Sequence, residues 1–170
     1  MLNTIFKNIA QEENADLEIV EDVVSYSDGS RSPHLIYKMY IPYKGCTIHF
    51  VNKTGTEFYG IVVSNFPKKM ENLEFEISVR SHFISLFTTK IDRIRLDTKS
   101  ALVSSFFKQS SAFKTLSQIS ESTVFEPSII GANNEDIFNV TTKYSLQFSD
   151  WTKSIKPIIQ LQKQFIDFFI

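Results

Sequence analysis

The sequence predicts a single α+β domain over residues 1–170, in which a helical insertion and a C-terminal helix accompany a curved antiparallel β-sheet of five to seven strands. Three observations lead to this prediction. Residues 34–79 alternate between apolar and polar side chains with the period of β-strands. Residues 98–119 and 155–170 carry apolar side chains at helical spacing. A chain of 170 residues suits one domain. We expect the C-terminal helix to pack on the sheet.

Composition narrows the class of protein. A hydrophobic content of 42% excludes a disordered chain, and five glycines exclude a collagen-like one. A net charge of −1 lacks the basic excess expected of a general nucleic-acid binder. The single Cys46 cannot form an internal disulfide, which suits a reducing compartment. No secretory signal or transmembrane stretch is visible, so we expect a cytoplasmic protein.

The N-terminal region begins with a short amphipathic helix. Leu2, Ile5, Phe6 and Ile9 share one face over residues 2–10. Seven acidic residues and no basic one follow between positions 12 and 28. Two interpretations remain open for this acidic segment. It is a solvated strand and turn, or it is a docking surface for a basic partner.

Two turns set the predicted registers of the strands that follow. A two-residue turn at Lys44-Gly45 pairs Tyr43 with Cys46, and one at Thr54-Gly55 pairs Asn52 with Glu57. Both registers place their apolar side chains on the same face, which supports them because a one-residue slip would invert a strand. The predicted apolar face comprises Tyr37, Met39, Ile41, Tyr43, Cys46, Ile48, Phe50, Tyr59, Ile61 and Val63.

Further elements follow from periodicity and capping. Residues 73–79 alternate as a strand, and residues 91–96 form a short strand or a helix lead-in. Asp97 or Thr98 then caps a helix that runs to Lys108. A second helix is expected near 111–119.

The C-terminal third combines turns, a strand and a helix. Residues 120–136 are rich in turn-forming residues, and residues 138–148 alternate as a long strand. Ser149 or Ser154 is the expected N-cap of the last helix. If Ser154 is the cap, Pro157 lies in the first turn, and if Ser149 is the cap, Pro157 should kink the helix.

The last helix has an apolar arc of roughly 200°, which is wider than one packing partner requires. Its aromatic residues therefore have two possible roles. Trp151, Phe165, Phe168 and Phe169 dock into a partner's groove or a homodimer, or they serve the core of their own domain. The sequence leaves both roles open.

Motifs for catalysis, cofactors and metals are scarce. The sequence contains no Gly-rich phosphate loop and no GxSxG, so we expect no nucleotide cofactor and assign no catalytic residue. Cys46 and His49 have CxxH spacing but should lie on opposite faces of one strand, so we expect no metal there. His34 and His82 lack a clustered ligand set. Cys46 on an apolar face should be unreactive.

One row of residues is a candidate ligand site. The predicted registers place Tyr40, His49 and Gly60 side by side on the second sheet face. Phenol and imidazole groups bind ligands or transfer protons, and the glycine would leave room for a ligand to approach. The alternative is that helices cover this face and His49 only satisfies a neighbour.

These observations favour a non-enzymatic binding or adaptor domain that acts through protein contacts. The first alternative is a small-molecule binding protein with an apolar ligand between the sheet and a helix. A hydrolase or isomerase that uses His49 as a general base has less support. Nucleic-acid binding is disfavoured, because Arg80 and the basic residues at 90–95 have acidic neighbours.

Overall fold

Eight antiparallel strands form one open sheet in the computed structural model, which describes residues 2–25, 27–54, 59–67, 72–80, 93–145 and 152–170. The strands are β1 (Asp16–Ser25), β2 (Arg31–Tyr43), β3 (Cys46–Thr54), β4 (Tyr59–Pro67), β5 (Phe75–Val79), β6 (Ile94–Thr98), β7 (Ser128–Asn134) and β8 (Ile137–Ser145). The described helices are α1 (Leu2–Glu12), α3 (Ala101–Gln109), α4 (Ser111–Ser122) and α5 (Thr152–Phe169). The predicted α+β class is confirmed, with eight strands instead of five to seven.

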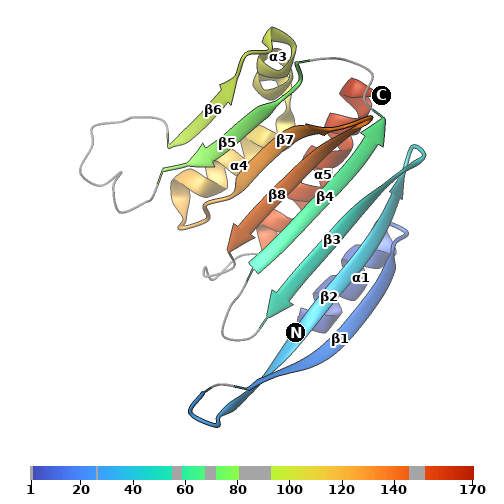
Figure 1. Ribbon diagram of the computed structural model, residues 1–170, viewed down its shortest axis with the longest axis vertical. Helices are drawn as coiled ribbons and strands as arrows, with labels where there is room; N and C mark the ends of the chain where they lie inside the picture. Colours follow the sequence, from blue (N-terminus) through green and yellow to red (C-terminus); the bar gives the residue numbers. More distant parts are fainter. Residues whose placement is uncertain (1, 26, 55–58, 68–71, 81–92, 146–151) are drawn as a thin grey trace.

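The molecule has two layers. The strand order is β1-β2-β3-β4-β8-β7-β5-β6, so β1 and β6 form the two edges of the sheet. All described helices lie on one face of the sheet, with α1 behind the N-terminal strands and α5 behind its centre (Figure 1). The core lies between these layers, and no described helix covers the opposite face. We call this opposite face the open face.

The N-terminal helix and the first hairpin agree with the predictions. Phe6 of α1 is fully buried and stacks on Tyr37 of β2, with 4.1 Å between the ring centroids. The turn residues Lys44 and Gly45 have φ values of 48° and 77°, as a two-residue hairpin of type I′ requires. Tyr43 pairs with Cys46, as predicted.

The predicted register of the second hairpin is wrong by three residues. Asn52 pairs with Gly60 instead of Glu57, because β3 continues through Thr54 and β4 begins only at Tyr59. The connection is therefore longer than the expected two-residue turn. An odd shift exchanges the two faces of a strand. The buried side chains of β4 are thus Val62, Ser64 and Phe66, whereas Tyr59, Ile61 and Val63 lie on the open face.

The helical insertion has the predicted pair of helices but a different start. The N-cap of α3 is Ser100, whose side chain accepts a hydrogen bond from the backbone of Val103. Asp97 and Thr98 are not the cap, because they belong to β6 and pair with β5.

The predicted turn-rich segment 120–136 contains β7. The predicted strand 138–148 is confirmed as β8 through Ser145, and residues 146–148 lie outside the described residues.

The C-terminal helix packs on the sheet as predicted. It begins at Thr152, so Ser154 is not its N-cap and Pro157 lies inside the helix. The other predicted cap, Ser149, lies outside the described residues. Phe165 of α5 is the centre of an aromatic cluster, with ring centroids 5.2 Å from Phe75 and 5.0 Å from Phe106. The high aromatic content of the chain is therefore largely core.

Candidate functional site

Tyr40 of β2 and His49 of β3 lie opposite each other on the open face, as predicted. Their rings meet edge to face with 5.3 Å between centroids. The registers continue this row through Val63 of β4, Thr141 of β8 and Ile130 of β7. Five neighbouring strands thus contribute one residue each to a continuous line, which we call the open-face row.

Gly60 does not belong to this row. The corrected register places Val63 opposite His49, and Gly60 lies opposite Asn52 and Tyr144 on the buried face. A Cβ atom at Gly60 would lie 2.1 Å from Cζ of Tyr144. The space beside this glycine is therefore filled by the tyrosine ring, and the glycine does not open the sheet to a ligand.

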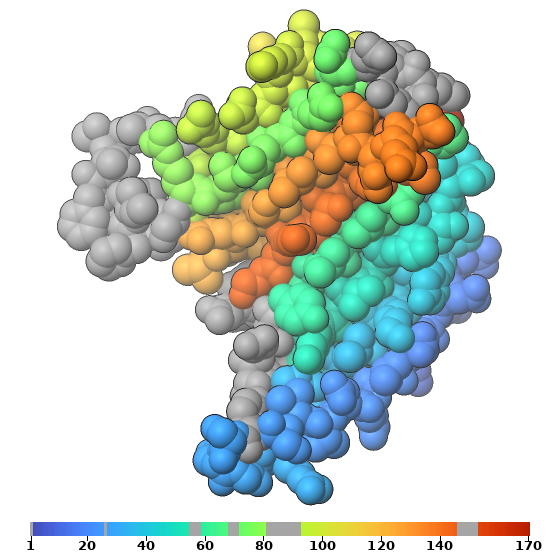
Figure 2. Space-filling view, in the orientation of Figure 1, coloured from blue at the N-terminus to red at the C-terminus, as the bar shows by residue number. Residues whose placement is uncertain are grey.

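The open-face row is more apolar than a solvated sheet face usually is. Tyr40 is 39% exposed and Ile130 is 38% exposed, while Val63 is half-buried. The space-filling view looks onto this face and shows the strands from β1 to β6 side by side (Figure 2). Charged side chains flank the row, with Lys38 and Lys143 next to it and Glu76 toward the far edge. This arrangement resembles the apolar centre and polar rim of protein interfaces.

The aromatic side chains predicted to dock a partner lie mainly in the core. Phe165 and Phe169 are 1% and 3% exposed, so they cannot contact a partner without opening the domain. Phe168 is 39% exposed at the end of α5. Trp151 lies outside the described residues. The wide apolar arc of α5 packs against β4 and α4 and contributes to the aromatic cluster around Phe165.

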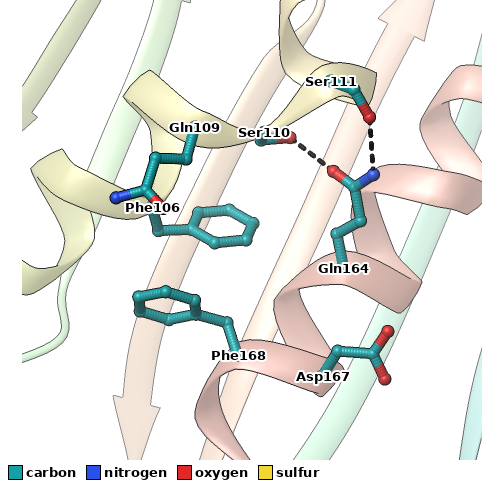
Figure 3. Close-up of a pocket in the computed structure, with 7 residues that line it drawn as sticks. All are labelled: Phe106, Gln109, Ser110, Ser111, Gln164, Asp167 and Phe168. Carbon is teal, nitrogen blue, oxygen red and sulfur yellow. Dashed lines mark hydrogen bonds between the residues drawn. The ribbon is translucent and has the colours of Figure 1, made fainter.

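A hollow of about 260 Å³ adjoins Phe168, where the turn between α3 and α4 meets α5. Figure 3 shows the rings of Phe106 and Phe168 next to each other, with 5.2 Å between their centroids, and the amide of Gln164 beside the turn. Gln164 accepts a hydrogen bond of 2.7 Å from the Ser110 hydroxyl and donates one of 2.9 Å to Ser111. Both polar atoms of the Gln164 amide are thus hydrogen-bonded within the domain. The hollow is therefore better explained as a gap where helices pack than as a ligand site.

The end of α5 is also tied to the first hairpin. Asp167 also lines the hollow, and its carboxylate accepts a hydrogen bond of 2.9 Å from the Tyr43 hydroxyl. It forms an ion pair with Lys44 as well. The hydrogen bond from Lys44 holds the pKa of Asp167 below its usual value. The same contact raises the pKa of Lys44.

The described residues contain no cluster of three or more His, Cys, Asp or Glu side chains that could hold a metal ion. Cys46 and His49 lie on opposite faces of β3, as their spacing predicts. His34 is buried in β2 and lies opposite Asp22 of β1. His82 lies outside the described residues. Chelation by Cys46 and His49 therefore has no geometric support.

Sequence reasoning identified two of the five residues of the open-face row. Val63 was assigned to the wrong face by the register error. Ile130 lies in a segment whose Gly131, Asn133 and Asn134 indicate turns more strongly than a strand. The alternation of β8 was visible, but its position between β4 and β7 depends on contacts distant in sequence. The strand order was the missing information.

No helix in the described part of the chain is long and apolar enough to cross a membrane. No protein-family model matches the chain, and no curated protein or solved structure shows significant similarity to it.

Proposed function

We propose that this protein is a non-enzymatic binding domain that docks another folded protein on the open face of its sheet. The observation that carries the proposal is the open-face row, in which Tyr40, Val63 and Ile130 place apolar surface across the side that no described helix covers. His49 and Thr141 alternate with these three side chains in the row. A mixture of apolar and polar side chains inside a charged rim is typical of protein interaction sites.

The dimensions of the open face suit a protein partner. Seven strand spacings of about 4.8 Å give the sheet a width of about 34 Å. A standard interface of about 800 Å² per partner fits on a surface of this width. The exposed Tyr40 is of a residue type enriched at interface hot spots. The flanking Lys38 and Lys143 would contact the partner at the rim, where charges select partners more than they add affinity.

An apolar small molecule between the sheet and α5 has less support. Phe165 lies within 6.0 Å, centroid to centroid, of Phe75, Phe106 and Phe138. The space that such a ligand would occupy holds these rings. We therefore favour a protein partner over a buried lipid-like ligand.

Site-specific photocrosslinking in the native cells tests the proposal. A photoreactive residue at Val63 or Ile130 should give a crosslinked species of one discrete mass. Matched positions on the helical side, Gln118 and Gln160, should give none, although both are exposed.

A second variant ties the crosslink to the open-face row. Tyr40→Ala should lower the yield from Val63 at least tenfold, since truncating a hot-spot residue costs about 2 kcal/mol or more. Lys7→Ala on α1 is the control and should leave the yield unchanged. Crosslinks that form only from Gln118 or Gln160, or that survive Tyr40→Ala, would contradict the proposal.

A further inference from the structure

The edge strand β1 presents main-chain hydrogen-bonding groups that no described strand pairs. The type I′ turn makes Tyr43 and Cys46 a hydrogen-bonded pair, so the odd-numbered residues of β2 bond to β3 and its even-numbered residues bond to β1. The N–H and C=O groups of Leu17, Ile19 and Glu21 therefore point away from the sheet. Figure 1 shows β1 as the outermost strand on its side.

The N–H group of Val23 follows the same alternation. It donates a hydrogen bond of 2.9 Å to the side chain of Asp22. The two prolines of β2 agree with this assignment. An N–H at Pro33 would point toward β3, but the pairing of β2 with β3 begins only at Leu35. An N–H at Pro42 would point toward β1, but the pairing of β2 with β1 ends at Tyr40. Neither proline therefore removes a hydrogen bond from the sheet.

This edge lacks most features that prevent another strand from adding. β1 has ten residues, which is longer than the usual five or six. It contains no proline and no lysine, and its one-to-one register with β2 leaves no bulge. Apart from the Asp22 contact with the N–H of Val23, the protection described for this edge is its negative charge, which repels acidic partners.

The charges of β1 select the kind of strand that can pair with it. Asp16, Glu18 and Asp22 lie on the open-face side of the strand, and Glu21 lies on the other side. β1 contains no basic residue, and Glu18 forms an ion pair of 3.3 Å with Lys38 of the neighbouring strand. Opposite charges on directly facing residues stabilise a strand pair, and like charges destabilise it.

We propose that β1 accepts an extended, basic segment of another protein, which adds to the sheet as a ninth strand. This inference rests on the proposed protein-binding function but uses a different surface. The segment alternates basic and apolar residues. Its basic side chains face Asp16, Glu18 and Asp22, and its apolar side chains lie beside Leu17 and Ile19, which pack against the core.

A second copy of the chain is a poor occupant. In an antiparallel β1–β1 pairing centred on Val20, Glu18 of each copy lies opposite Asp22 of the other. The pairing would bring eight carboxylates and no basic residue of β1 together. Like charges in facing positions destabilise such a pair.

Binding of designed peptides to the intact protein tests the proposal. The probe is a fluorescently labelled ten-residue peptide of alternating Lys and Val, and the readout is fluorescence anisotropy. Its affinity should fall at least tenfold when the backbone nitrogens of its Val residues are methylated, because in an antiparallel pair these residues lie opposite Leu17, Ile19 and Glu21 and must donate to their outward carbonyl groups. A peptide of alternating Glu and Val should not bind. Equal binding of the methylated peptide would overturn the proposal, because charge alone would then explain the affinity.

Two variants locate the site. The N–H of Val23 must exchange the Asp22 carboxylate for a peptide carbonyl when a strand adds. Val23→Pro removes this N–H without disturbing the β1–β2 ladder, so it should weaken binding of the Lys peptide at least tenfold while the far-UV circular dichroism spectrum stays unchanged. Asp16→Lys with Asp22→Lys should abolish binding of the Lys peptide and permit the Glu peptide. Glu76→Lys with Asp97→Lys makes the same charge change toward the β6 edge and should have little effect.

The possible outcomes separate this inference from the proposed function. If the methylated and unmethylated Lys peptides bind equally while Val63 and Ile130 still give crosslinks, only the proposal for the β1 edge is wrong. If Val23→Pro weakens peptide binding but the open face gives no crosslinks, only the proposal for the open face is wrong. A concentration-dependent dimer that Val23→Pro dissociates, measured by sedimentation velocity, would show a second copy on β1 and overturn the basic partner.

Discussion

The aromatic ring of Tyr144 lies over Gly60 on the neighbouring strand of the sheet. Phe75 and Gly131 repeat the arrangement between β5 and β7, where a Cβ atom at the glycine would lie 2.1 Å from the phenylalanine ring. In both pairs the missing side chain lets a large ring lie flat against the backbone. Each glycine is thus needed for core packing.

Gly60→Ala should therefore destabilise the protein. In an ordinary strand, Ala is more stable than Gly by up to about 1 kcal/mol. Here the added methyl group displaces the ring of Tyr144, and overpacking of this kind costs about 1–3 kcal/mol. Urea unfolding measures the change. In a Tyr144→Leu background the same substitution should become neutral or stabilising, and an unchanged penalty there would contradict the explanation.

Gln162 of α5 is fully buried and connects two strands at the centre of the core. It accepts a hydrogen bond from the hydroxyl of Ser64 on β4 and donates one of 3.1 Å to Thr142 on β8. Gln162→Leu should cost about 1–3 kcal/mol, because both hydroxyls lose this partner in a buried setting. Chemical denaturation measures the loss.

Two further variants check this interpretation. Gln160→Leu, on the exposed side of the same helix, should change stability by less than about 0.5 kcal/mol. Adding Ser64→Ala and Thr142→Val to Gln162→Leu should recover much of the stability, since removing all partners together leaves no unsatisfied group. A triple variant that is less stable than Gln162→Leu would contradict the hydrogen-bond explanation.

The aromatic residues of α5 should differ sharply in their contribution to stability. Phe165→Ala should cost about 3–5 kcal/mol, because it leaves a cavity among four or more rings. Phe168→Ala should cost about 1 kcal/mol or less, because that ring is partly exposed. Thermal unfolding of both variants distinguishes them. Equal losses would show that Phe168 is a core residue.

The contact of Asp167 with Lys44 and Tyr43 should make stability depend on pH. The folded-state pKa of Asp167 lies below its usual value because of the hydrogen bond from Lys44. Its stabilising effect is therefore present above the unfolded pKa of about 3.9 and is lost as the pH falls through the folded pKa.

Asp167→Asn should lower Tm by about 1–3 °C at pH 7, a small effect because solvent screens this exposed pair. The difference from the wild type should narrow as the pH falls below about 4. A Tm difference that persists unchanged at pH 2.5 would show that the carboxylate charge is not its source.

The residues of the turn itself were sufficient to predict the first hairpin, whereas the register of β4 depends on contacts that are distant in sequence. Lys44-Gly45 needs only two residues with positive φ, so Tyr43, Cys46 and the faces of β2 and β3 were correct. The register of β4 failed because a Thr-Gly pair resembles a turn although β3 continues through Thr54. That one error moved Val63 to the wrong face and added Gly60 to the candidate site.

The C-terminal half shows the same division. The periodicity of α4 and β8 was sufficient to predict them. The N-cap of α3 was misplaced because Asp97 and Thr98 are equally good capping residues by type, and only their pairing with β5 assigns them to a strand. The location of β7 beside β8, which completes the open-face row, depends on tertiary contacts alone.

The pairing of β4 with β8 has a consequence for the order of folding. Strands β1 to β4 form successive hairpins of low sequence separation, whereas β4 reaches β8 only across the whole insertion. Closing so long a loop is entropically costly, so this seam should form late. Gln162 bridges the seam by bonding one strand on each side. The last helix of the chain thereby joins the early meander to the later half of the sheet.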